Sequence, residues 1–172
     1  MNFAPFAGLR FEVALDAAGS APLVIEPLPP QAAPVLGGAF AAVDPWATYG
    51  FSAETLATYF AALEPGAPRF LLTRGGEVAG ALGVRLAWLR GPYVQFLGVL
   101  PEMQRQGIGS AALNWVERQA RAGKERNLWI AASQINTQAI NLYERLGFRD
   151  AAWLDSLLCE GRTEILMRKR LA

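Results

Sequence analysis

The strongest structural signal in the sequence is an apolar stretch from Tyr93 to Leu100 that ends at Pro101. Nearly continuous hydrophobicity over this length is typical of a strand that is buried on both faces of a sheet. A short polar segment follows, and Gly107 and Gly109 then open an amphipathic helix that extends to about Ala122. This order predicts a sheet with helices packed against it.

The segments on either side of this unit predict further strands and helices. We expect a β-hairpin from Arg69 to Trp88 and, before it, a helix that Ser52 caps and whose apolar positions extend to Leu63. The other predicted elements are strands at 23–25, 128–132, 152–157 and 163–170, and helices at 31–43 and 137–146. Hairpins followed by a β-α-β-α-β stretch indicate an α/β (α+β) fold with a mixed, mostly antiparallel sheet.

Composition excludes several classes of function. The chain has no histidine, which excludes Ser-His-Asp and Cys-His catalysis and the usual His-based zinc sites. Cys159 is the only cysteine, so neither an intrachain disulfide nor a thiolate metal cluster is expected. A net charge of +1 gives no electrostatic reason to expect nucleic acid or an anionic membrane as a partner.

The same composition bounds the size and location of the protein. The 172 residues, of which 52% are hydrophobic and 18% charged, fit one domain with a substantial core. No apolar run is long enough to span a bilayer, and the first residues lack the positive charge of a signal peptide. A cytoplasmic location is therefore expected.

The segment from Gln104 to Ser110 carries the chemical information. Free amides at a helix start, together with the positive end of the helix dipole, form a binding site for an anion such as pyrophosphate, and Arg105 adds a positive charge there. The local pattern alone also fits a flexible helix start without a ligand. A dinucleotide-binding fingerprint is excluded, because residues 101–106 separate the glycines from the strand and no acidic residue ends the next strand.

Two motifs, in this order, resemble those of the GNAT superfamily of N-acetyltransferases. The first is Gln104-x-x-Gly107-x-Gly109, which resembles the acyl-CoA-binding motif, and the second runs from Asn136 to Phe148. A predicted helix and strand separate the two. The resemblance implies a GNAT domain over 23–172 with splayed central strands. Residues 1–22 form an N-terminal extension of uncertain structure, in which 17–22 is predicted as a loop.

The resemblance implies a role for each position that matches the motifs. Backbone groups of Leu97 and Val99 would hydrogen-bond the pantetheine arm of acetyl-CoA, and Asn136 would touch it. Tyr143 would protonate the departing CoA thiolate. The pyrophosphate would be held by the main-chain amides of Gln104, Arg105, Gln106, Gly107, Ile108, Gly109 and Ser110.

Structural explanations for two of these residues stay open. Asn136 could serve only as the N-cap of the helix that begins at Thr137. Tyr143 shares a helix face with Ala139 and Leu146 and could simply fill the core.

The general base is not identified by the sequence. Relatives that resemble ribosomal-protein alanine acetyltransferases carry a glutamate where this chain has Ala131, and the central strand offers Gln95 rather than a carboxylate. Because the amine must be neutral to attack and no base is identified to deprotonate it, we hypothesise that the acceptor is a weakly basic amine. A relayed water is one alternative base, and the candidate carboxylates, each also typical of an exposed surface, are Glu102, Asp44, Glu54 and Asp155.

An aromatic segment lies between the first two predicted helices, in a region that lines the acceptor pocket in the superfamily. Its residues Trp46, Tyr49 and Phe51 would form an apolar wall for the substrate. The alternative is a loop that only packs on the sheet.

The sequence therefore predicts an N-acetyltransferase that moves an acetyl group from acetyl-CoA to a primary amine of a small molecule, peptide or protein. Direct attack in a ternary complex is implied, with alignment of the two reactants as the main contribution of the protein. No metal is expected, and a homodimer is compatible with the resemblance. The alternatives are a non-catalytic acyl-CoA-binding sensor and a scaffold that uses the fold only structurally.

Overall fold

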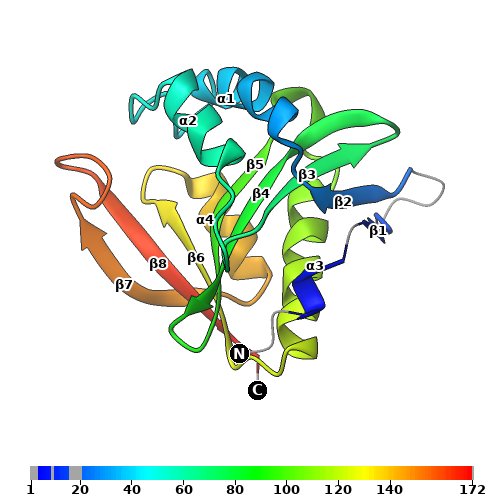
Figure 1. Cartoon of the computed structure of the whole chain (residues 1–172). Helices are drawn as coiled ribbons and strands as arrows, with labels where there is room; N and C mark the ends of the chain where they lie inside the picture. Colours follow the sequence, from blue (N-terminus) through cyan, green and yellow to red (C-terminus); the bar gives the residue numbers. More distant parts are fainter. Residues whose placement is uncertain (1–3, 9, 16–20, 172) are drawn as a thin grey trace.

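The computed structural model describes residues 4–8, 10–15 and 21–171 (Figure 1). Within these ranges, eight strands form one sheet in the order β1-β2-β3-β4-β5-β6-β8-β7. Neighbouring strands pair antiparallel, except that β5 (Gly91–Val99) and β6 (Asn127–Ser133) are parallel. The predicted mixed, mostly antiparallel fold class is thus confirmed.

The remaining elements surround this central pair. The other strands are β1 (Phe11–Val13), β2 (Leu23–Pro27), β3 (Arg69–Arg74), β4 (Glu77–Trp88), β7 (Arg149–Asp155) and β8 (Thr163–Arg170). The α-helices of the described residues are α1 (Ala33–Ala41), α2 (Ala53–Ala61), α3 (Ile108–Ala122) and α4 (Thr137–Arg145). None of them combines the length and the apolar character needed to cross a bilayer.

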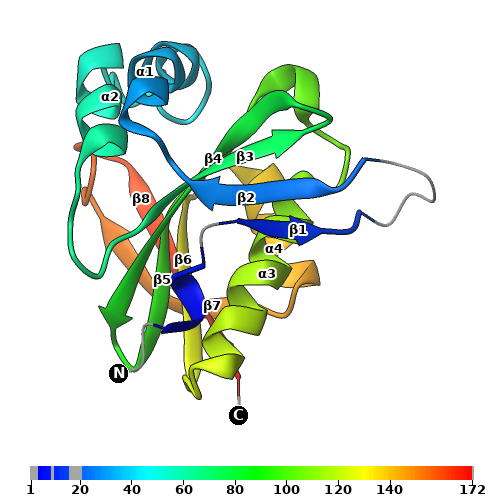
Figure 2. The ribbon, with the colours of Figure 1, turned by 45° about the vertical axis from the view of Figure 1, so that its right-hand side comes forward.

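Alternate side chains of the strands pack into two separate cores. Leu71 of β3 joins Phe40 of α1 and Phe60 of α2, whereas its neighbours Phe70 and Leu72 belong to the core that contains Trp115 of α3. Figures 1 and 2 show α1 and α2 together, well apart from α3. Because both faces of the sheet are covered, its central strands are nearly continuously apolar.

The described part of the N-terminal segment adds an edge strand to the sheet. β1 pairs with β2, and the rings of Phe6 and Phe11 pack on Trp115 with centroids 5.7 and 5.0 Å away. Most of the loop predicted at 17–22 lies outside the described residues, as do residues 1–3.

The two central parallel strands pair over only two residues. Tyr93 lies opposite Trp129 and Val94 opposite Ile130. At Gln95 the strand β5 has a bulge, because its register with β4 shifts there by one residue. Beyond this point β5 pairs only with β4 and β6 only with β8, so the predicted splay of the central strands is confirmed.

The structure corrects the end of one predicted helix. The side chain of Ser52 accepts a hydrogen bond from the Thr55 N–H at 3.0 Å, which confirms it as the N-cap of α2. The helix ends at Ala61, however, and Leu63, which was placed on its apolar face, is 89% exposed. Pro65 explains this end, since it lacks the N–H that would bond to the Ala61 carbonyl.

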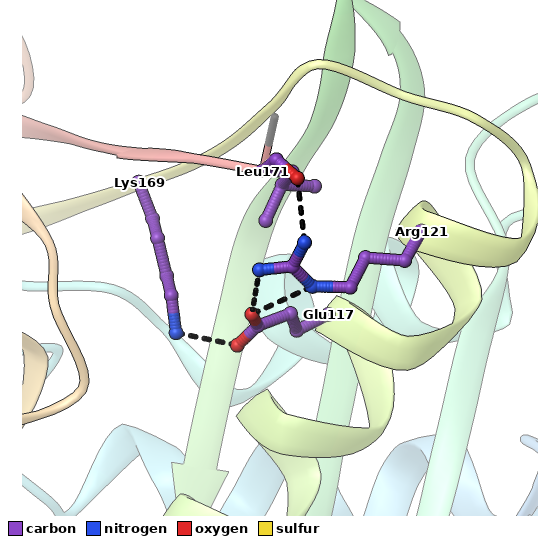
Figure 3. A network of polar contacts seen from close by, with 4 residues as sticks. All are labelled: Glu117, Arg121, Lys169 and Leu171. Carbon is purple, nitrogen blue, oxygen red and sulfur yellow. Dashed lines mark hydrogen bonds and ion pairs between the residues drawn. The ribbon is translucent and has the colours of Figure 1, made fainter.

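A polar network joins α3 to the end of β8 (Figure 3). Glu117 accepts hydrogen bonds from Arg121 at 2.8 and 3.0 Å and from Lys169 Nζ at 2.5 Å, and Arg121 also donates to the Leu171 carbonyl. Burial raises the pKa of Glu117, but the hydrogen bonds from Lys169 and Arg121 outweigh burial and hold this pKa below its ordinary value. The ionised carboxylate therefore stabilises the folded state.

We expect Glu117→Gln to lower the free energy of unfolding at neutral pH by about 1 kcal/mol. Because the folded-state pKa lies below the unfolded value of about 4.3, the contribution is complete above that value and is lost as pH falls through the folded pKa. Denaturant unfolding between pH 7 and pH 3 measures the difference, with the exposed Glu77→Gln as control. A difference from wild type that stays constant over this range would contradict the assignment.

Candidate active site

A groove of about 380 Å³ lies between the end of β5 and the start of α3, and we call it the helix-start groove. Six of the seven residues predicted to hold pyrophosphate line it: Gln104, Arg105, Gly107, Ile108, Gly109 and Ser110. Gln106 does not line the groove, because its side chain bonds to Arg74 and donates to the Glu102 carbonyl.

The first turn of α3 presents free N–H groups to this groove. Its N-cap is Gly107, which has φ 78° and no side chain to accept a hydrogen bond from the turn. Arg105 is also left-handed, with φ 60°, so two successive sharp bends bring the chain into the helix. Unpartnered amides at the positive end of a helix dipole attract an anion.

The opposite wall of the groove is the free edge of β5. The Leu100 N–H donates to the Ala79 carbonyl at 2.9 Å, so in the alternating pattern of an antiparallel pair the backbone groups of Leu97 and Val99 point away from β4. Gln104 Nε2 donates to the Val99 carbonyl at 3.1 Å, which agrees with this direction. Both predicted strand positions therefore direct backbone groups into the gap that β6 leaves.

Two arginines line the helix-start groove, and the sequence identified only Arg105. The second is Arg145, in the last turn of α4, two residues after Tyr143. Its place inside the second motif was the available signal. The two cations add to the attraction that the α3 amides exert on an anionic ligand.

A second space continues from the groove, and we call it the aromatic cavity. It has a volume of about 460 Å³ and is lined by all three predicted acceptor residues, Trp46, Tyr49 and Phe51. Trp46 also stacks on Phe96, with ring centroids 4.5 Å apart, so the segment both packs on the sheet and borders the cavity. The residues that line both spaces are Pro45, Trp46, Leu97, Asn136, Ala139 and Tyr143.

Tyr143 lies where the two spaces meet. Its side chain is 6% exposed and packs against Phe148, and no described residue hydrogen-bonds to its hydroxyl. Burial raises the pKa of Tyr143 above its ordinary value, and the nearby Tyr93 raises it further. The hydroxyl therefore stays protonated at neutral pH and is able to donate, although the ring also fills the core.

Asn136 is the N-cap of α4 and also borders both spaces of the candidate site. Its side-chain oxygen accepts a hydrogen bond from the Ala139 N–H at 3.1 Å, which makes it the N-cap of α4. It also lines both the helix-start groove and the aromatic cavity. Gly147 has φ 90° just after the last turn of α4, as expected for a residue that ends a helix.

The candidate bases proposed from sequence do not line the aromatic cavity. Glu102, Glu54 and Asp155 are exposed and border neither space, and Asp44 borders only the groove, where it accepts hydrogen bonds from Thr48. The carboxylate in the cavity is Glu164 of β8, which the sequence analysis missed. A charged residue within an apolar strand pattern was the only signal for it.

Comparison with known proteins agrees with this architecture. Residues 39–148, more than half of the chain, match the model of the acetyltransferase (GNAT) family. The chain belongs to this family of acetyltransferases, as the two motifs predicted.

Two curated relatives are N-acetyltransferases. An N-alpha-acetyltransferase of Sulfurisphaera tokodaii is 29% identical over 134 residues, which cover 69% of this chain and 75% of that protein. The [ribosomal protein bS18]-alanine N-acetyltransferase of Escherichia coli is 34% identical over 82 residues, which cover 48% of this chain and 55% of that enzyme.

Solved structures share the fold over most of the chain. The crystal structure of the ribosomal-protein-S18-alanine N-acetyltransferase from E. coli has a TM-score of 0.68 and 25% identity, and covers 87% of this chain and 94% of that one. Mycobacterium smegmatis RimJ in complex with CoA-disulfide has a TM-score of 0.73 and 15% identity, and the match covers 96% of this chain and 88% of that one.

We expect Arg145→Ala to weaken the binding of coenzyme A about 5- to 10-fold, because one of the two arginines that line the groove is lost. The loss should shrink as salt is raised, since salt screens this attraction. Calorimetry with coenzyme A measures both effects. The exposed Arg118→Ala on α3 is the matched control, and an equal loss in the control would refute a specific role.

The aromatic cavity predicts a difference between two truncations. Phe51 lines only the cavity, so Phe51→Ala should raise the KM for the acceptor about 10-fold and leave the KM for acetyl-CoA unchanged. Trp46 lines both spaces, so Trp46→Ala should raise both values. Steady-state kinetics with each substrate varied in turn distinguishes them, and parallel effects of Phe51→Ala on both substrates would argue against an acceptor cavity.

Proposed function

We propose that this protein transfers an acetyl group from acetyl-CoA to a primary amine of a small molecule, peptide or protein. The observation that carries the proposal is that the helix-start groove and the aromatic cavity meet at Tyr143. Direct transfer of an acyl group between two bound substrates needs two binding spaces that join, and a proton donor for the leaving thiolate at the place where they meet.

The groove has the donors that coenzyme A requires. The amides at the start of α3, with Arg105 and Arg145, would face the pyrophosphate. The backbone of Leu97 and Val99 would hydrogen-bond the pantetheine arm, and Asn136 would contact it from the other wall. The CoA complex of the structurally similar mycobacterial RimJ supports this choice of ligand.

The chemistry that suits the site is direct attack. The amine nitrogen in the aromatic cavity would bond to the thioester carbonyl carbon, the carbon–sulfur bond would break, and Tyr143 would give its proton to the leaving thiolate. Cys159 is not among the described residues that line either space, and the chain has no histidine, so these residues offer no activated nucleophile for a covalent intermediate.

The names of the relatives support amines of peptides or proteins among the acceptors. One relative is an N-alpha-acetyltransferase and another acts on the alanine of ribosomal protein bS18. An α-amine has a pKa of about 7.7–8.0 and is therefore more easily neutralised than a lysine side chain near about 10.4. A cytoplasmic location would fit such acceptors.

Tyr143→Phe should lower kcat about 100-fold while the affinity for acetyl-CoA stays within about twofold of wild type, because only the proton donor is lost. Gly109→Leu should have the opposite effect: the affinity for acetyl-CoA should fall, since the new side chain would project into the groove, while kcat should change little. Thiol release with an amine library, together with calorimetry, separates the two effects. Wild-type kinetics in both variants would refute the assigned site.

The same experiment separates the enzyme from the acyl-CoA sensor. A sensor would bind acetyl-CoA and release no thiol beyond the rate of hydrolysis with any amine. A scaffold would bind no coenzyme A, and its melting temperature would not rise on addition of acetyl-CoA.

A further inference from the structure

The described residues that line the aromatic cavity include a single charged side chain. Among the described residues that line it, Glu164 of β8 is the only one with an ionisable acid or base other than tyrosine. Glu164 is 4% exposed and lies opposite Ser133 of β6, which is 3% exposed. A carboxylate that is buried to this extent is costly unless hydrogen bonds and a counter-charge stabilise it.

The protein satisfies only part of this requirement. Tyr49 donates its hydroxyl proton to Glu164 Oε1, and the same hydroxyl lies 2.5 Å from Ser133 Oγ. A phenol has one proton and a carboxylate only accepts, so the Ser133 hydroxyl donates to Tyr49 in turn. No described residue donates to Oε2, and no described cation forms an ion pair with Glu164.

The remaining ionisable groups around Glu164 do not supply the missing charge. Tyr93 of β5 lies close enough for Glu164 to raise its pKa, and Tyr93 in turn raises the pKa of Tyr143. Arg162, just before β8, acts on Tyr49 and lowers the pKa of that phenol, although burial and Glu164 raise it overall. The nearly buried carboxylate therefore borders the cavity with one oxygen, Oε2, that accepts no hydrogen bond from a described residue, and it has no counter-ion among the described residues.

We propose that Glu164 binds the ammonium group of the acceptor and removes its first proton. The proposal rests on the proposed acetyl transfer. One proton passes from the ammonium nitrogen to Glu164 and then to solvent, and the neutral amine attacks the thioester carbon. The second proton leaves the nitrogen as the amide forms and restores Tyr143, which has given its own proton to the CoA thiolate.

The same cavity restricts the class of acceptor. Its other walls are largely aromatic and aliphatic, and no lysine or arginine among the described residues lines it. A carboxylate next to the reacting amine would find no counter-charge and would face Glu164. The acceptor is therefore a primary amine whose neighbouring group is uncharged, as in an alkylamine, an amino-acid amide or a peptide N-terminus, and not a free amino acid.

The first arm of the test replaces the carboxylate. Glu164→Gln should lower kcat/KM for the amine about 100-fold and leave the Kd for acetyl-CoA unchanged. The matched control is Glu160→Gln, which alters an exposed carboxylate in the loop between β7 and β8. If wild type releases no thiol with any amine, the proposed function fails. If wild type is active and Glu164→Gln matches it, only the role of Glu164 is overturned.

The second arm uses pH and keeps the carboxylate in place. Burial raises the pKa of Glu164, and the hydrogen bond from Tyr49 lowers it. Removal of that bond in Tyr49→Phe should raise the pKa of Glu164, so the acidic limb of kcat/KM should move to higher pH. A limb that does not move in Tyr49→Phe overturns the proposal, and this arm stands even where Glu164→Gln does not fold.

The third arm tests the class of acceptor with matched pairs. Wild type should prefer L-alaninamide to L-alanine, and L-phenylalaninamide to L-phenylalanine, at least 10-fold in kcat/KM. Because an amide also lowers the pKa of its amine, the decisive quantity is the change of this ratio in Glu164→Gln. The ratio should shrink once repulsion from the carboxylate is removed, and an unchanged ratio overturns the assignment of specificity.

Discussion

The early parting of β5 and β6 is the constraint on which the site depends. Parallel strands normally pair along their length, but here only Tyr93 and Val94 of β5 find partners on β6. Backbone groups that lie inside a protein need hydrogen-bond partners. The side chain of Gln104 supplies one partner, at the Val99 carbonyl, and the rest of the free edge is left to a ligand or to water. Under the proposed function, the opening would provide both the space for coenzyme A and the backbone groups that hold its pantetheine arm.

Residues that are close in sequence made half of the site predictable. The amides from Gln104 to Ser110 and the caps at Ser52 and Asn136 lie in continuous segments whose local pattern specifies their geometry, whereas the resemblance to the GNAT superfamily implied the roles of Leu97 and Val99. Helix starts and strand ends depend mainly on such local rules. By the same rules Pro65 predicts the end of α2, whereas the apolar spacing alone wrongly extends the helix to Leu63.

The acceptor side was not predictable in this way, because it is assembled from distant strands. Tyr49 and Glu164 are 115 positions apart, and Tyr49 and Ser133 are 84 apart. Their meeting depends on the register of β6 against β8, and a slip of one residue would turn Glu164 to the opposite face of the sheet. The sequence shows only that Ala131 replaces the glutamate of relatives, and the candidates it offered, Glu102, Asp44, Glu54 and Asp155, do not include the carboxylate that β8 contributes to the cavity.

The charges of the two spaces are complementary to the two proposed substrates. Among the described residues, Arg105, Arg145 and the α3 amides outweigh the carboxylate of Asp44 in the groove, whereas the charged residue of the cavity is Glu164. A polyanionic cofactor and a cationic amine would therefore each enter the correct space, and their reacting ends would meet at Tyr143.

Burial raises the pKa of both proposed proton-transfer groups, but the chemical consequences for the two groups are opposite. It raises the pKa of Tyr143, which keeps the phenol protonated and able to donate at neutral pH. It also raises the pKa of Glu164, which makes that carboxylate a better proton acceptor. The hydrogen bond from Tyr49 opposes the second shift and favours the ionised carboxylate. Burial would thus make Glu164 basic enough to accept a proton, and the hydrogen bond from Tyr49 would keep enough of it ionised to do so.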